Sequence, residues 1–184
     1  MIITIGCLSL PCPIKRPAAA ANSSAIAISV LCKIFPYISF SLEPRRFKAG
    51  KTYNWPQAED PTGKAFDASV IPNTDAPAYR DLSFLSNFET ANNKAHYTIT
   101  NPEQKIGFSV SWDAQIFKCL WLWQERNASQ DFPWWGKCYT VALEPWTSKY
   151  TNEPDKAIQN GEWLSIKAGE VISTSLSAGA IVTK

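Results

Sequence analysis

Tryptophans gather in residues 117–148, the stretch best equipped for chemistry, and a carboxylate lies near its end. The stretch holds five of the chain's eight tryptophans and carries Glu144 between an apolar strand and a Pro-Trp pair. Sugars present apolar C–H faces that lie flat on indole rings, and rims of hydroxyls that bond to carboxylates and amides. A carboxylate at a strand end can also exchange a proton when its surroundings set its pKa. The residue types suit carbohydrate binding, although tryptophans also serve as plain core residues and Glu144 as a solvated strand end.

Alternation with a period of two residues predicts two strands in this stretch. In the first, a mixed aromatic and polar face alternates with a mainly aliphatic one: Cys119, Trp121, Trp123 and Glu125 against Leu120, Leu122 and Gln124. The second strand alternates in the same way: Cys138, Thr140, Ala142 and Glu144 against Tyr139, Val141 and Leu143. The aliphatic faces are expected in the core. The indoles and Glu144 are therefore expected together on the face turned toward ligand or water.

The rest of the chain reads as strands and turns. Residues 56–77 form a connecting region broken by prolines, and residues 79–88, 96–100 and 105–112 resume alternation, with a turn at Asn101-Pro102. A loop at 151–154 and a tight turn at Asn160-Gly161 precede expected strands at 162–166 and 171–182. Helical periodicity of useful length is absent. The sequence predicts an all-β fold of antiparallel strands.

Composition narrows the classes of function. A chain of 184 residues with 45% hydrophobic and 18% charged residues is long enough for one domain with a real core. A net charge of +2 gives no field that would recruit nucleic acid or an acidic membrane. The eight glycines are scattered and form no phosphate-cradling loop. We expect no nucleic-acid partner, no membrane partner and no cofactor.

Metal and disulfide chemistry are not favoured. The five cysteines include no CxxC pair, and the single histidine, His96, has no patterned carboxylate beside it. We expect no metal site and a structural or exposed His96. Cys119 and Cys138 lie on the two predicted strands and could meet across a sheet, but reduced thiols in a cytoplasmic protein are the simpler interpretation.

Residues 1–40 differ from the remainder. They are apolar, poor in charge and free of acidic residues, so Lys15-Arg16 followed by an apolar run could pass for a weak secretory signal. The run is short for a membrane span and Asn22-Ser23-Ser24 interrupts it. We favour an atypical N-terminal segment that pairs loosely or stays disordered, followed by a domain over residues 41–184.

Four segments carry a family resemblance: Trp112-Asp113, LWLWQE, PWWGKCYTVALEPWTS and NGEWLSIKAGE. Together they resemble the C-terminal half of the aldose 1-epimerase (galactose mutarotase-like) superfamily, in particular a bacterial, tryptophan-rich branch. The resemblance covers roughly residues 47–184. Its specific parts are the EPWTS strand end and the closing L-x-x-x-x-G-E.

This resemblance implies a large antiparallel β-sandwich, the galactose mutarotase-like supersandwich, that binds a sugar in a shallow cleft on its concave sheet. In the family a glutamate removes the proton of the anomeric hydroxyl and a histidine protonates the ring oxygen, which makes the enzyme an isomerase. Glu144 stands at the position of that glutamate. The implied sugar-binding residues are Asp81, Trp121, Trp123, Gln124 and Trp146.

The chain departs from the family pattern upstream of the matching region. The family's histidines come from early strands, yet residues 1–51 contain no histidine. We therefore expect a sandwich that is incomplete at its N-terminal side and able to self-associate through exposed sheet edges. Three functions stay open: an active mutarotase with Glu144 as base, a catalytically impaired sugar-binding or regulatory module, and a truncated fragment.

Overall fold

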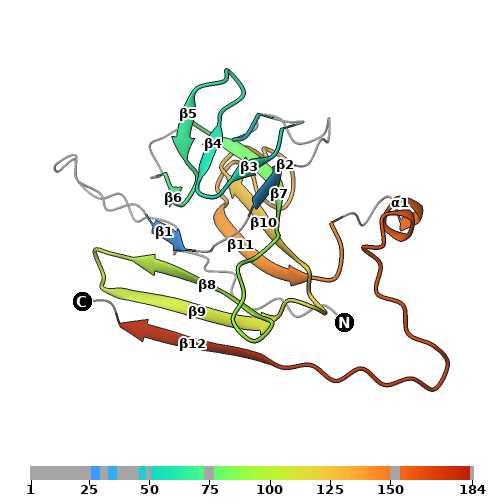
Figure 1. Ribbon diagram of the computed structural model, residues 1–184. Coiled ribbons are helices and arrows are strands. Elements are labelled where there is room, and N and C mark those ends of the chain that lie inside the picture. The colour runs from blue at the N-terminus through green and yellow to red at the C-terminus, as the bar shows by residue number, and fades with distance from the viewer. Residues whose placement is uncertain are drawn as a thin grey trace.

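The computed structural model describes residues 26–29, 33–36, 46–48, 51–72, 77–149 and 154–182. Within these ranges the chain is built from antiparallel strands and one short helix, so the all-β prediction is confirmed. Figure 1 shows two sheets and a small hairpin lobe.

Sheet A has five strands in the order β12-β9-β8-β1-β6, and every pairing is antiparallel. Its strands are β1 (Ile26–Ser29), β6 (Val70–Ile71), β8 (Lys94–Asn101), β9 (Ile106–Asp113) and β12 (Leu176–Val182). The central pair β8–β9 is joined at Asn101-Pro102, where the sequence predicts a turn.

Sheet B also has five antiparallel strands, in the order β11-β10-β7-β2-β3. Its strands are β2 (Lys33–Pro36), β3 (Tyr53–Asn54), β7 (Tyr79–Ser86), β10 (Cys119–Arg126) and β11 (Tyr139–Trp146). A separate hairpin, β4 (Gln57–Glu59) with β5 (Ala65–Asp67), forms the lobe above sheet B in Figure 1.

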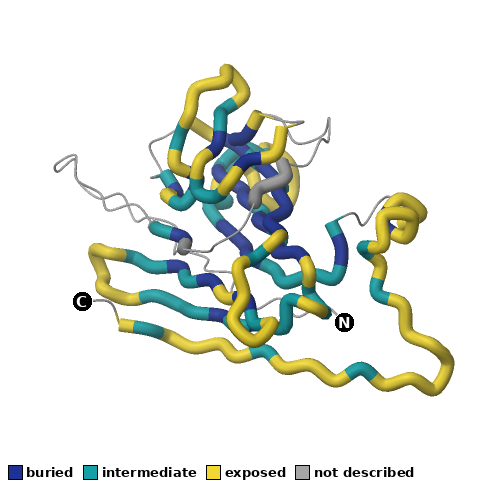
Figure 2. Tube along the Cα trace, in the orientation of Figure 1, coloured by how far each residue is buried: buried dark blue, intermediate teal, exposed yellow. Residues whose placement is uncertain are grey.

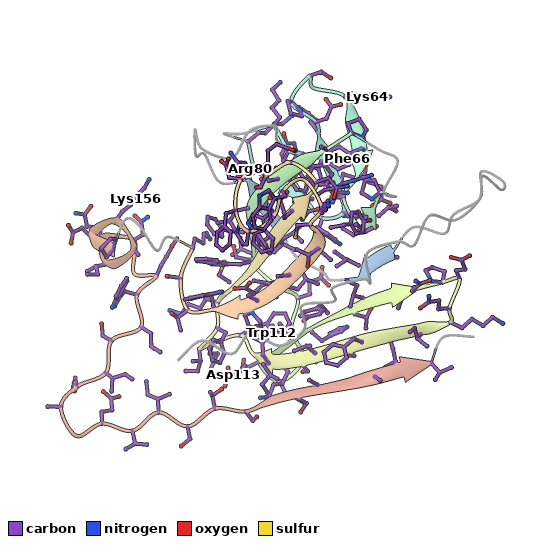
Figure 3. All side chains as sticks on the ribbon, turned by 180° about the vertical axis from the view of Figure 1, so that it is seen from behind. Lys64, Phe66, Arg80, Trp112, Asp113 and Lys156 are labelled. Carbon is purple, nitrogen blue, oxygen red and sulfur yellow. The ribbon has the colours of Figure 1, made fainter. Side chains whose placement is uncertain are left out.

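One hydrophobic core joins the two sheets. Sheet B contributes the four aliphatic residues that the alternation assigned to the core, Leu120, Leu122, Val141 and Leu143, and sheet A contributes Tyr97, Ile99, Val110 and Trp112. The hydroxyl of Tyr97 donates a hydrogen bond to the carbonyl of Leu143 at 3.3 Å, which links the layers directly. In Figure 2 the buried residues concentrate along β7 and β10, and Figure 3 shows Trp112 near the junction of the two sheets.

The described parts of the N-terminal segment, residues 26–29 and 33–36, take part in the two sheets. Strand β1 pairs with β8 and β6, and strand β2 pairs with β7 and β3. Ile28 of β1 is a core residue that is 2% exposed. The described part of this segment is therefore paired with strands of the domain expected over residues 41–184.

The C-terminal quarter differs most from the prediction. A helix, α1 (Pro154–Gln159), begins where a loop was expected, with proline at its first position and Asp155 in its first turn, both typical of helix starts. No strand forms at 162–166, and the last strand begins at Leu176 rather than Val171. Both predictions were wrong because residues 162–175 have no neighbouring strand to pair with, whereas residues 176–182 pair with β9.

Candidate functional site

The face of sheet B that points away from sheet A carries the predicted site. Trp121 on β10 lies directly opposite Glu144 on β11 and opposite Phe84 on β7. Side chains of directly paired residues share one face of a sheet, so these three lie together. Trp123 and Trp146 have the same parity and join them. The prediction that Glu144 shares a face with the tryptophans is confirmed, and we call this surface the tryptophan face.

Glu144 is held by an indole. The Nε1–H of Trp146 donates to Oε2 of Glu144 at 3.0 Å. The Trp146 ring is itself stacked on Trp121, with ring centroids 4.4 Å apart and planes 17° from parallel. The Nε1–H of Trp121 donates to the carbonyl of Ser148 at 2.9 Å. The carboxylate therefore sits beside two fixed, half-buried rings.

One aromatic side chain of a loop, Trp134, extends this face. Trp123 lies 6.0 Å from Trp134, which belongs to the loop between β10 and β11. In the same loop Phe132 and Trp135 form an edge-to-face pair at 5.2 Å, and both are exposed. Phe84 and Trp134 were not among the predicted site residues, all of which lie on strands. The sequence Pro133-Trp134-Trp135 could have indicated Trp134, because it places two adjacent tryptophans just before the second strand.

A small cavity of about 110 Å³ lies beside the stacked tryptophans. Most of its lining residues carry a polar side chain: Ser86, Asn87, Lys118, Cys119, Thr147, Ser148, Lys149 and Glu162. Lys149 and Glu162 form an ion pair across 3.5 Å at its border. Ser148 contributes to the cavity and also binds the Trp121 indole, so the hollow adjoins the aromatic pair. Hydroxyl, ammonium and carboxylate groups next to stacked rings can hold a polyhydroxylated molecule.

Asp81 and Gln124 do not belong to this face. They are directly paired with each other and point toward sheet A, where both are almost fully buried. Oδ2 of Asp81 accepts the backbone N–H groups of Arg46 at 2.9 Å and Phe47 at 3.0 Å. Oε1 of Gln124 accepts from Nη1 of Arg46 at 2.7 Å. The structure therefore does not bring these two together with Glu144, and their described bonds anchor the 46–47 segment.

Burial shifts the pKa values of several ionisable groups in the interior of the protein. Desolvation lowers the pKa of Arg46, and nearby Tyr79 and Asp81 oppose that effect. Desolvation raises the pKa of Tyr79, with Arg46 and Arg126 opposing it. Burial alone raises the pKa of Tyr97 to about 12. These hydroxyls stay protonated at neutral pH.

His96, the only histidine in the chain, is exposed on β8 of sheet A. Its neighbours Ala95 and Tyr97 point into the core, so His96 points away from it. Glu144 lies on the outer face of the other sheet, and no imidazole accompanies it.

Two further expectations concern metal and sulfur. Among the described residues no group of three or more His, Cys, Asp or Glu side chains is placed to hold a metal ion. Cys119 pairs with Trp146 while Tyr139 pairs with Arg126, so Cys119 and Cys138 lie near opposite ends of the β10–β11 pair. The suggestion that these two thiols meet across the sheet was wrong.

In the described part of the chain no helix is long and apolar enough to cross a membrane.

Comparison with protein-family models, with curated proteins and with solved structures gave no match to this chain. The aldose 1-epimerase resemblance is therefore supported only by the sequence segments that carry it.

Proposed function

We propose that the tryptophan face binds a carbohydrate in the manner of the aldose 1-epimerase superfamily, with Glu144 as the group that bonds to the anomeric hydroxyl. One observation carries the proposal: Trp121 lies opposite Glu144 while its ring stacks on Trp146, whose indole N–H holds the carboxylate. A flat apolar platform with a carboxylate at its edge matches the two surfaces of a pyranose ring.

The carboxylate suits the role of acceptor. Among the described residues it takes one hydrogen bond, from Trp146 at Oε2, and no lysine or arginine forms an ion pair with it. Glu144 is half-buried, which leaves part of the carboxylate open to a ligand. A carboxylate so placed can accept a hydrogen bond from a sugar hydroxyl or remove its proton.

Anomer interconversion needs a second group that protonates the ring oxygen, and such a step typically contributes ~10²–10⁴-fold. His96 lies on the other sheet and points away from the core. The proposal is therefore binding with little acceleration of mutarotation, which favours the impaired sugar-binding or regulatory module over the active isomerase.

Calorimetric titration with glucose and galactose tests binding directly. We expect weak binding by the parent chain, loss of binding in Trp121→Leu, and unchanged binding in Trp135→Leu, which removes an exposed indole from the loop. Equal binding by both variants would move the site away from the stacked pair, and an absence of binding by the parent would refute the proposal.

Polarimetry of freshly dissolved α-glucose tests the chemistry. We expect a rate close to that in buffer, and the same rate with Glu144→Gln. A fast rate abolished by Glu144→Gln would show an active isomerase with another acid. A fast rate that survives this substitution would remove Glu144 from the site.

A further inference from the structure

Two arginines lie buried at one end of sheet B, on the face opposite the tryptophans. Arg46 is 7% exposed and Arg126 is 2% exposed. Arg126 lies between Tyr79 on β7 and Tyr139 on β11 in the strand register. Its guanidinium carbon is 5.8 Å from the centre of the Tyr79 ring and 5.5 Å from that of Tyr139. Arg46 also lies 5.8 Å from the Tyr79 ring, so two guanidinium groups contact one aromatic ring.

The two guanidinium groups differ in their hydrogen bonds. Arg46 donates from Nη1 to Gln124 at 2.7 Å and from Nη2 to the carbonyl of Val70 at 2.6 Å. Arg126 has no hydrogen-bond partner at Nε, Nη1 or Nη2. The Tyr79 hydroxyl interacts with Arg126 without reaching hydrogen-bond geometry, and it donates its own proton to Gln124 at 3.1 Å.

Gln124 adds a further unpartnered donor. Its Oε1 accepts from both Arg46 and Tyr79, which fixes the orientation of the amide. Its Nε2 then has no partner, although Gln124 is 1% exposed. Gln124 and Arg126 occupy successive inward-facing positions of β10, so the two residues with unpartnered donors are neighbours on this face of the sheet.

Charge is unbalanced in the same place. Asp81 is the one described carboxylate on this face of sheet B, and its Oδ2 is taken by two backbone N–H groups. The buried carboxylate of Glu125 points to the other face, where it accepts from Ala128 and Ser129. Two guanidinium groups thus share one described carboxylate. Buried polar groups are nearly always hydrogen-bonded, and an unpaired buried cation is costly, so this cluster calls for a negatively charged acceptor.

We propose that Arg126 and the amide nitrogen of Gln124 bind a small oxyanion, a phosphate or carboxylate group, inside sheet B. The guanidinium fork matches two oxygens of such a group, and Nε2 of Gln124 supplies a further donor. The site uses the face opposite Glu144 and is independent of sugar binding.

Calorimetric titration of the full chain with inorganic phosphate, at constant ionic strength set by chloride, tests the proposal. We expect one phosphate per chain and a rise in thermal transition temperature with phosphate that chloride does not produce. In Arg126→Met the affinity should fall roughly 10- to 100-fold, the range for hydrogen bonds to a charged group. Arg126→Lys keeps the charge without the fork, and we expect it to bind weakly.

The matched control is Arg80→Met, which removes a nearby arginine on the opposite face of the sheet, where it donates from Nη1 to the hydroxyl of Ser129 at 3.3 Å. Its phosphate affinity should equal that of the parent. Repeating the titration with acetate distinguishes a carboxylate ligand from a phosphate ligand. If neither anion binds the parent, or if Arg126→Met binds as tightly as Arg80→Met, the proposal is overturned. If Arg126→Met does not fold, the parent and Arg126→Lys titrations decide the question.

Discussion

Leu143→Ala measures the strand register on which the tryptophan face depends. Leu143 is 3% exposed, belongs to the shared core and lies under the hydroxyl of Tyr97, which bonds to its carbonyl. Truncating a buried leucine removes its transfer free energy and leaves a cavity, at a cost of ~2–5 kcal/mol. Both sheets enclose this site and limit its collapse, so we expect the upper half of that range. In a domain of this size, where 1 kcal/mol shifts the transition by about 2–4 °C, the thermal transition temperature should fall by roughly 7–20 °C.

Urea unfolding followed by circular dichroism gives the free energy, and Leu82→Ala is the matched control. Leu82 is a half-buried leucine on β7 that lies opposite Trp123, on the tryptophan face. Its truncation should cost about 1 kcal/mol, in proportion to the smaller area it buries. A slip of one residue would exchange the two faces of a strand and bring Glu144 inward. If Leu143→Ala cost no more than Leu82→Ala, the register and the site built on it would be wrong.

Two more outcomes follow from the fold. Burial raises the pKa of Tyr97 to about 12, so the folded protein keeps a proton that the unfolded chain loses above pH ~10. The free energy of unfolding should therefore fall by about 2–3 kcal/mol as the pH rises from about 10 to about 12. Tyr97→Phe should show a shallower decline, and an identical pH profile would contradict this assignment. Strand β12 forms an edge of sheet A and ends in Val182, 87% exposed, so we expect concentration-dependent self-association that Val182→Lys weakens. Light scattering that shows a monomer at every concentration would count against it.

The central strands could be predicted from sequence because their local pattern and their surroundings agree. On β10 and β11 aliphatic residues alternate with polar or indole side chains, and burial alternates with them from Leu120 to Gln124 on β10. On β11 the register rather than burial shows the alternation, because Val141, Ala142 and Leu143 are all buried. The predicted strand bounds differ from the observed ones by only a few residues. The shared face of Glu144, Trp121 and Trp123 follows from the same parity.

Pairing partners could not be predicted in this way. Residues 171–175 have the composition of a strand, yet in this part of the chain β9 pairs only with residues 176–182. Residues 162–175 have no neighbouring strand, and Trp163, Ile166 and Val171 are exposed along this part of the chain, which is mostly exposed in Figure 2. An apolar stretch forms a strand here only where a segment distant in sequence, β9, lies beside it. Local periodicity carries no information about that distant neighbour.

Asp81 and Gln124 show where the family resemblance and the strand pattern diverge. The resemblance grouped both with Glu144, whereas alternation already placed Gln124 on the opposite face from Trp121 and Trp123. On β7 the pattern is ambiguous, because Leu82 and Phe84 point outward while Asp81 and Ser83 point inward. Asp81 tolerates that position because backbone N–H groups of Arg46 and Phe47 replace its water. Sheet B therefore has polar chemistry on both faces: the half-buried carboxylate of Glu144 among indoles outside, and the buried guanidinium group of Arg126 without a hydrogen-bond acceptor inside. A variant that abolishes sugar binding without changing phosphate binding, and one that does the reverse, would separate the two faces experimentally.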